Sequence, residues 1–131
     1  MAARSPPGYK VLAVSTSMYF SRKCEGMGSP RPFAAETEWI AKTESVAVRV
    51  HTLAPGQGSP WHFHTVVTDD VFCMDDGIEI RLRSPDETVK LAAGQRQRVA
   101  AGRVHQVVNT GPAPARYLLV QATGPYDFNE V

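Results

Sequence analysis

Short runs of alternating apolar and polar residues, divided at regular intervals by turn-forming residues, limit what this chain can fold into. In the clearest run, Val46, Val48 and Val50 alternate with more polar neighbours, and the run stops near the Pro55-Gly56 turn. Alternation with a period of two is typical of a β-strand. Further candidate strands cover residues 61–64, 71–74, 78–83, 88–91, 95–99, 105–109 and 116–121. Short strands at this spacing predict an all-β sandwich or barrel.

Three local predictions complete this fold. The Asp75-Asp76-Gly77 turn lies between apolar runs and favours a hairpin that joins residues 71–74 to residues 78–83. Residues 34–42 are the one segment in which we expect a turn of helix. Residues 10–20 have room for one or two further short strands.

Length and charge exclude several classes of function. The chain has 131 residues and a formal net charge of +1, which suits one domain with a single core and gives no electrostatic reason to expect a nucleic-acid or membrane partner. The apolar run at residues 11–14 is too short for a signal peptide or a membrane span. We interpret Cys24 and Cys73 as reduced thiols. We therefore expect a cytoplasmic protein with a flexible leader at residues 1–8.

The histidines carry the strongest chemical signal. His62 and His64 are two residues apart, so on an extended segment both imidazoles project from the same face. The acidic pair Asp69-Asp70 follows shortly, and His105 opens a later candidate strand. Imidazole nitrogens combined with a carboxylate oxygen suit a first-row divalent ion. This pattern predicts a metal site.

Two segments resemble the two motifs of the cupin superfamily. Residues 56–77 carry, in order, a glycine, a His-any-His triplet, an acidic residue and a glycine. Residues 94–109 carry two glycines, a histidine and an asparagine at the spacing of the second motif, with Ala100 where the family has proline. The resemblance implies a single small cupin domain at residues 9–131, folded as an antiparallel jelly-roll barrel, or double-stranded β-helix.

The resemblance also implies a ligand set. His62, His64, Asp70 and His105 would hold a divalent transition metal, Fe, Mn, Ni or Zn, inside the barrel. Counting back from the glycine that ends the first motif selects Asp70, whereas counting forward from His64 selects Asp69. Neighbours on a strand face opposite ways, so only one can serve. We choose Asp70, because the loop after His64 can absorb an extra residue; a site of three histidines alone is the remaining alternative.

Open metal positions permit catalysis without choosing the reaction. The resemblance implies an enzyme acting on a small organic substrate, such as a carboxylate or dicarbonyl compound, either as an Fe(II)-dependent dioxygenase or as a Lewis-acid isomerase or lyase. The alternative is a non-catalytic module that binds or senses a small ligand. A metal-free sugar-nucleotide epimerase ranks last, since it would not need the full ligand set. Edge strands and apolar outer positions lead us to expect a homodimer.

Other polar and aromatic residues have simpler explanations. We expect Arg49 and His51 on the outside of the barrel, because long charged side chains are seldom buried; the alternative is that they line its mouth and offer a cation to an anionic substrate. Phe72 and Met74 share a face with Asp70, so we expect them beside the metal.

Three further residues, Asn109, Tyr117 and Gln121, lie in the second motif and on the last candidate strand. Asn109 is expected to satisfy backbone groups as a buried amide. Tyr117 and Gln121 alternate on the last strand and could reach the pocket, but for Tyr117 we favour a place in the core.

Overall fold

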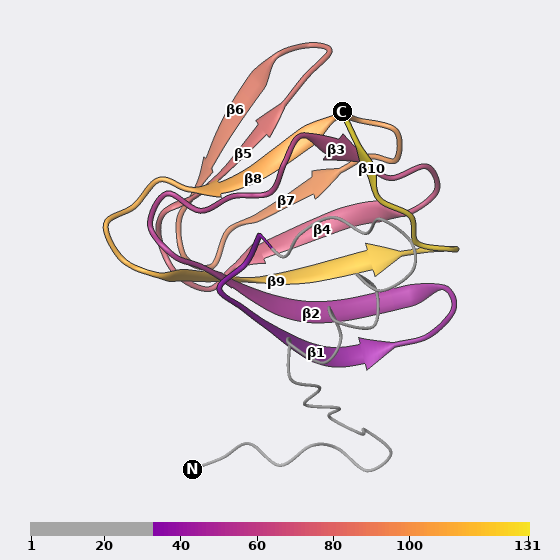
Figure 1. Ribbon diagram of the computed structural model, residues 1–131, viewed down its shortest axis with the longest axis horizontal. Coiled ribbons are helices and arrows are strands. Elements are labelled where there is room, and N and C mark those ends of the chain that lie inside the picture. Colours follow the sequence, from indigo (N-terminus) through magenta and orange to yellow (C-terminus); the bar gives the residue numbers. More distant parts are fainter. Residues whose placement is uncertain (1–32) are drawn as a thin grey trace.

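The computed structural model describes residues 33–131, which form ten β-strands and no helix (Figure 1). The strands are β1 (Glu36–Lys42), β2 (Val46–Leu53), β3 (His62–Phe63), β4 (Thr68–Cys73), β5 (Ile78–Leu82), β6 (Glu87–Leu91), β7 (Arg96–Val99), β8 (His105–Asn109), β9 (Ala115–Ala122) and β10 (Asn129–Glu130). No helix in this range is long and apolar enough to cross a membrane. The leader predicted at residues 1–8, the strands predicted at residues 10–20 and Cys24 lie outside the described residues.

The strands form two five-stranded antiparallel sheets that face each other (Figure 1). Sheet A has the order β1-β2-β9-β4-β7, and sheet B has the order β10-β3-β8-β5-β6. Chain neighbours such as β4 and β5 lie in different sheets, so the chain crosses repeatedly between them. The all-β jelly-roll fold predicted from the alternation and the motifs is confirmed.

Strand β1 replaces the turn of helix that we expected at residues 34–42. It pairs with β2 in antiparallel register, with a bulge between Trp39 and Ala41. Thr37 and Trp39 are buried, whereas Glu36 and Glu38 are exposed. The helix expectation was wrong because the segment alternates with a period of two and its buried face packs inside the barrel.

The turn at Asp75-Asp76-Gly77 does not close a hairpin. Strand β4 pairs with β7 and β9, and β5 pairs with β6 and β8, so the turn carries the chain from sheet A to sheet B. Gly77 has a φ of +112°, and a Cβ at this position would lie 2.7 Å from the side-chain oxygen of Asn109. Glycine is therefore required at this position because the chain packs closely against Asn109 of β8. The local Asp-Gly pattern, which favoured a hairpin, does not show this contact.

Strand β2 places its charged residues inside the barrel. Arg49 and His51 are 8% and 5% exposed, whereas Val48 and Val50 on the other face are partly exposed. The outside position expected for Arg49 and His51 was wrong, because the inner face supplies polar partners. The hydroxyl of Thr37 lies 2.8 Å from Nδ1 of His51. Burial, reinforced by the charge of Arg49, holds the pKa of His51 well below its ordinary value, so the ring is neutral.

A contiguous apolar core fills the space between the sheets beside the histidines. It consists of Leu53, Val71, Cys73, Ile78, Ile80, Leu82, Leu91, Val99, Val107, Ala115, Tyr117 and Leu119. The structural role expected for Asn109 is confirmed: its amide donates to the carbonyls of Leu53 at 3.0 Å and Ala113 at 2.8 Å, and its oxygen accepts from the amide of Gly111 at 2.9 Å. One buried side chain thus links β8 to the end of β2 and to the turn before β9.

We predict that Asn109→Ala destabilises the fold by about 3 kcal/mol, because it removes a buried amide that bonds two carbonyls and one backbone amide. Urea unfolding followed by circular dichroism measures this change. Lys90→Ala, at an exposed position of β6, is the control and should change the free energy of unfolding by less than about 0.5 kcal/mol. Equal stabilities for the two variants would contradict the linking role of Asn109.

Candidate metal centre

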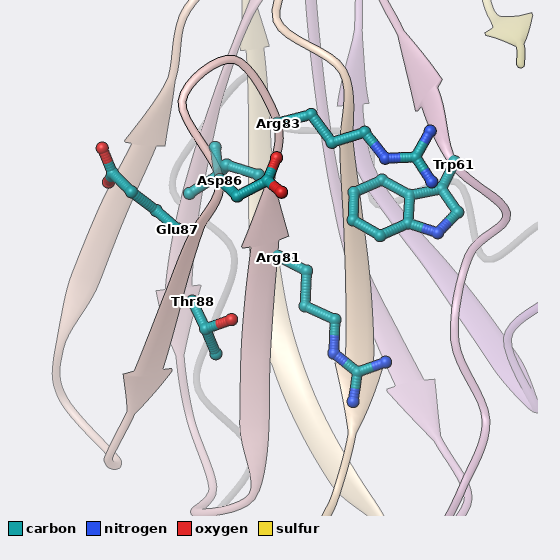
Figure 2. Close-up of a pocket in the computed structure, with 7 residues that line it drawn as sticks. Trp61, Arg81, Arg83, Asp86, Glu87 and Thr88 are labelled. Carbon is teal, nitrogen blue, oxygen red and sulfur yellow. The ribbon is translucent and has the colours of Figure 1, made fainter.

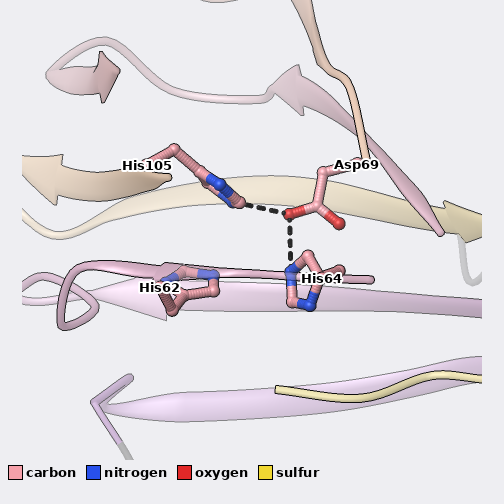
Figure 3. A group of neighbouring side chains, drawn as sticks. All are labelled: His62, His64, Asp69 and His105. Atoms are coloured by element: carbon pink, nitrogen blue, oxygen red, sulfur yellow. Dashed lines mark hydrogen bonds and ion pairs between the residues drawn. The ribbon is translucent and has the colours of Figure 1, made fainter. Parts of the chain in front are cut away.

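Three histidines and one aspartate meet between the two sheets (Figure 3). His62 on β3 pairs directly with His105, the first residue of β8, and His64 follows the end of β3. Asp69 reaches them from β4 in sheet A. Because His62 and His64 are two residues apart on an extended segment, both rings point to the same side, as the sequence predicted.

The four side chains form a tight, buried cluster. One potential ligand atom from each residue lies within 4.8 Å of all the others, and every member is buried. The carboxylate oxygen Oδ2 of Asp69 lies 3.1 Å from Nε2 of His64 and 3.0 Å from Nε2 of His105. The centroids of the His62 and His105 rings are 4.3 Å apart. This spacing leaves room for one small cation between the four groups.

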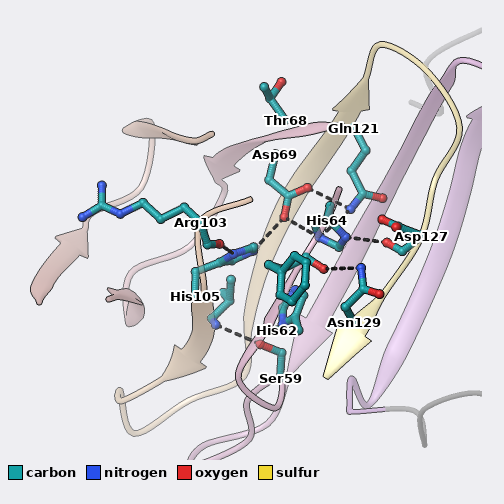
Figure 4. A network of polar contacts seen from close by, with 12 residues as sticks. Ser59, His62, His64, Thr68, Asp69, Arg103, His105, Gln121, Asp127 and Asn129 are labelled. Carbon is teal, nitrogen blue, oxygen red and sulfur yellow. Dashed lines mark hydrogen bonds and ion pairs between the residues drawn. The ribbon is translucent and has the colours of Figure 1, made fainter. Parts of the chain in front are cut away.

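The second nitrogen of each imidazole determines what this cluster can hold. Nδ1 of His62 lies 2.8 Å from the Pro60 carbonyl. Nδ1 lies 2.7 Å from the Asp127 carbonyl in His64 and 2.8 Å from the Arg103 carbonyl in His105 (Figure 4). A carbonyl oxygen only accepts, so each Nδ1 carries a proton and donates it. In the neutral ring, Nε2 is then an unprotonated lone pair.

These lone pairs face a group that cannot donate to them. The Nε2 atoms of His64 and His105 point at the carboxylate of Asp69, which is itself an acceptor. Two opposed acceptors require either an additional ring proton or a cation between them. Three imidazole lone pairs and one carboxylate are a donor set that fits a first-row divalent metal.

The electrostatics of the cluster agree with this requirement. Burial alone would raise the pKa of Asp69, but hydrogen bonds from His105 and His64 outweigh it and hold the pKa well below its usual range. Burial alone would lower the pKa of His64, but its hydrogen bond to Asp69 and the charge of that group raise it. Burial and the charge of His105 lower the pKa of His62 to about 3, so this ring is neutral. The cluster thus favours a positive charge beside Asp69.

Asp70, which the sequence led us to include in the ligand set, lies on the opposite face of β4. Its two oxygens accept from Nε and Nη2 of Arg98 at 2.9 and 3.0 Å. Phe72 shares this outer face, and Met74 is 42% exposed, so neither lies beside the cluster as we had expected. The inward face carries Asp69 instead. The carboxylate that the structure brings to the three histidines is therefore Asp69.

Two inner-face residues of sheet A support Asp69. Gln121 of β9, which the sequence placed within reach of the pocket, donates from Nε2 to the other carboxylate oxygen, Oδ1, at 2.9 Å. Arg49 in turn donates from Nη2 to the side-chain oxygen of Gln121. Tyr117 is buried in the core, as expected. The strand register explains these contacts, since Gln121 lies directly opposite Asp69.

A C-terminal segment, residues 124–131, covers the cluster. The ring of Phe128 is stacked on His62, with centroids 4.3 Å apart and an interplanar angle of 13°. Tyr126 lies beside His64 at 5.4 Å. The carboxylate of Asp127 accepts from the backbone amide of Thr65 at 2.8 Å and also from its hydroxyl. The two aromatic residues near the end of the chain are the sequence signal for this cover.

The cavity next to the cluster is small. Its volume is about 20 Å³, and its lining includes the cluster, Arg49, Gln121, Tyr126 and Phe128. This volume matches one water molecule or ion. A larger ligand therefore requires the C-terminal segment to shift.

A second cavity lies on the outer face of sheet B, away from the histidines (Figure 2). It has a volume of about 400 Å³ and is lined by Trp61, Arg81, Leu82, Arg83, Asp86, Glu87 and Thr88. The guanidinium of Arg83 lies 3.9 Å from the centroid of the Trp61 ring. Since Leu82 packs into the core, Arg81 and Arg83 project to the outside. This groove has no contact with the candidate metal centre.

Comparisons with known proteins agree with the fold. The model of the cupin domain family matches residues 49–121. An uncharacterized conserved protein with a double-stranded β-helix domain from Klebsiella pneumoniae has a TM-score of 0.63 and 26% identity, over 77% of this chain and 89% of that chain. The protein TT1209 from Thermus thermophilus has a TM-score of 0.62 and 24% identity, over 72% and 89% of the two chains.

An enzyme of known activity shares the fold at lower identity. Recombinant oxalate oxidase in complex with glycolate has a TM-score of 0.64 and 17% identity, over 76% of this chain and 56% of that chain. No curated protein matches the sequence. The family match spans more than half of the 131 residues, and the described strands form the double-stranded β-helix of its relatives, so this chain belongs to the cupin domain family.

Proposed function

We propose that this cupin is a metal-dependent enzyme that acts on a small organic substrate. A divalent transition metal, Fe, Mn, Ni or Zn, would be held by His62, His64, Asp69 and His105. The observation that carries this proposal is the arrangement of nitrogens: each Nδ1 donates to a carbonyl, so three Nε2 lone pairs converge with a carboxylate. The bound metal would supply either Lewis-acid polarisation of a substrate oxygen or, as Fe(II), activation of dioxygen.

The residues around the cluster would prepare it for this chemistry. Gln121 donates to Oδ1 of Asp69, which fixes the orientation of the carboxylate and leaves Oδ2 directed at the histidines. Phe128 and Tyr126 cover the cluster and exclude bulk water. The low dielectric of this enclosed site strengthens its electrostatic interactions.

We predict that Asp69→Asn lowers the affinity for Zn²⁺ or Mn²⁺ at least about tenfold, because the amide has no negative charge. His105→Ala should abolish binding, since it removes one of three imidazoles. Asp70→Asn is the matched control and should leave the affinity unchanged, because this side chain contacts Arg98 on the outer face. Isothermal titration calorimetry on protein purified without an affinity tag measures all four chains. Loss of affinity in Asp70→Asn but not in Asp69→Asn would contradict the assignment.

The two reaction classes differ in their need for dioxygen. We expect the protein loaded with Fe(II) or with Zn²⁺ to transform at least one member of a panel of small carboxylates and 1,3-dicarbonyl compounds. Oxygen consumption with Fe(II) alone indicates a dioxygenase, and product formation without oxygen consumption indicates an isomerase or lyase. His105→Ala serves as the inactive control. Metal-loaded protein that binds panel compounds but converts none would overturn the enzyme proposal in favour of the binding module.

The closed cavity is the observation that favours that alternative. A volume of about 20 Å³ admits no organic substrate unless the C-terminal segment moves. A protein that binds or senses a small ligand could use such a movement as its response.

We further propose a homodimer formed through the outer face of sheet A. One row of directly paired residues crosses this face in the order Glu38, Val50, Leu118, Phe72 and Arg96. Its centre is apolar and partly exposed, one edge is acidic and the other edge is basic. A second copy related by a two-fold axis parallel to the strands would place β1 over the partner's β7. Each acidic edge would then meet a basic edge, which makes the face self-complementary.

We predict that the chain elutes at twice its 14.3 kDa mass in size-exclusion chromatography with light scattering. Glu38→Arg and Arg96→Glu should each weaken the dimer, because they place like charges opposite one another. The double variant should restore it, since the two charges are exchanged. A monomeric wild-type chain, or a double variant weaker than both single variants, would contradict this interface.

A further inference from the structure

Arg49 is a buried charge that has no carboxylate partner among residues 33–131. Its side chain projects from β2 into the barrel and is 8% exposed. Among the described residues it forms no salt bridge, and its Nε is a buried atom with no hydrogen-bond partner. Its contacts are one hydrogen bond to Gln121 and the ring faces of Trp39 at 4.7 Å and Tyr126 at 5.3 Å. Stacking on two rings holds the plane of the guanidinium without neutralising its charge.

The nearest buried carboxylate is already committed to other groups. One oxygen of Asp69 faces Nε2 of His64 and His105 and the other accepts from Gln121, so its charge belongs to the candidate metal centre. The amide of Gln121 lies between Asp69 and Arg49, donating to the first and accepting from the second. Arg49 is thereby held beside the cluster while its charge stays unpaired. Burial of an unpaired charge is strongly unfavourable unless an anion compensates it.

The cavity gives this anion a location. Arg49 lines the same small cavity as His62, His64 and Asp69. The unpartnered Nε–H of the guanidinium can donate to a carboxylate oxygen, and the guanidinium supplies the opposite charge. The remaining lining of the cavity consists of the neutral His51, the uncharged Ser59 and Gln121, and aromatic and aliphatic side chains. Among the described residues it therefore offers no second cation for a doubly charged anion.

We propose that Arg49 binds the carboxylate of a small monoanionic organic acid, whose remaining oxygen-bearing end faces the three histidines. This inference rests on the proposed function for the role of the acid as a substrate, but the binding itself depends on Arg49. The charge of Arg49 favours the binding of carboxylic acids over that of uncharged dicarbonyl compounds. The cavity has room for about one water molecule, so even a small acid enters only as Tyr126 and Phe128 move aside.

Glycolate tests this proposal, because it is a small acid with a hydroxyl group and has an uncharged analogue of nearly the same shape, glycolamide. Calorimetric titrations should be run on the chelator-treated protein and on the protein loaded with Zn²⁺. We expect wild-type protein to bind glycolate at least about tenfold more tightly than glycolamide in at least one of the two states. Arg49→Met, which keeps the unbranched apolar stem, should remove this preference.

Two further variants keep the test decisive. Arg49→Lys retains the charge without the planar fork and should bind glycolate at least about fivefold more weakly than wild type, which provides a readout if Arg49→Met does not fold. Arg83→Met, in the outer groove of sheet B, should bind like wild type. Circular dichroism establishes that each variant is folded.

The outcomes separate this inference from the proposed function. Zn²⁺ binding with glycolate affinity that is insensitive to Arg49 overturns the inference and leaves the metal centre intact. Glycolate binding that depends on Arg49 in a protein without affinity for metals supports the inference and overturns the proposed function. Inorganic phosphate that binds as tightly as glycolate, with the same dependence on Arg49, overturns the assignment to carboxylates.

Discussion

Withdrawing a carboxylate from water is unfavourable by several kcal/mol unless cations or hydrogen-bond donors replace the lost hydration. Asp69 is 3% exposed, and the interior of this barrel is organised around that requirement. His64 and His105 approach one oxygen and Gln121 the other. The histidines are fixed in turn through carbonyls of residues 60, 103 and 127. The loops and the C-terminal segment that supply these carbonyls are therefore tied to the buried charge.

The need of the buried carboxylate for polar partners divides the interior of the barrel into two regions. The apolar core between Leu53 and Val107 packs side chains that need no polar partners. The other region holds Asp69, the histidines, Gln121 and Arg49, which are linked by polar contacts to one another and to backbone carbonyls. Among the described residues, Nε of Arg49 is the buried side-chain donor that has no hydrogen-bond partner. A buried donor without a partner identifies where an external group would join such a network.

Much of this architecture could be predicted from local patterns. Alternation gave the strands because one face of each is buried, and the spacing of His62 and His64 placed both rings on one side. Other features depend on contacts distant in sequence. The face of β2 that turns inward was misjudged, since valine favours burial in general but here the interior provides partners for Arg49 and His51. The turn at Gly77 resembles a hairpin locally, and only pairing with β8 shows that it joins two sheets.

The choice between Asp69 and Asp70 shows most clearly that local sequence patterns do not determine which face of a strand turns inward. Turning β4 over would exchange Asp69, Val71 and Cys73 for Asp70, Phe72 and Met74, and either set presents a carboxylate followed by apolar side chains. The sequence of the strand is therefore nearly symmetric between its faces. The neighbouring strand resolves the ambiguity, because Arg98 on β7 pairs with Asp70 on the outside.

That pairing gives an exposed salt bridge an importance beyond its small direct contribution to stability. An inverted β4 would still direct an acid at the histidines, so the sequence of this strand does not by itself exclude the inverted arrangement. Inversion of β4 would break the ion pair between Arg98 and Asp70 and bury the Asp70 carboxylate. The ion pair therefore favours the observed orientation of the strand. A surface ion pair thus helps to determine that Asp69, and not Asp70, is the buried acid.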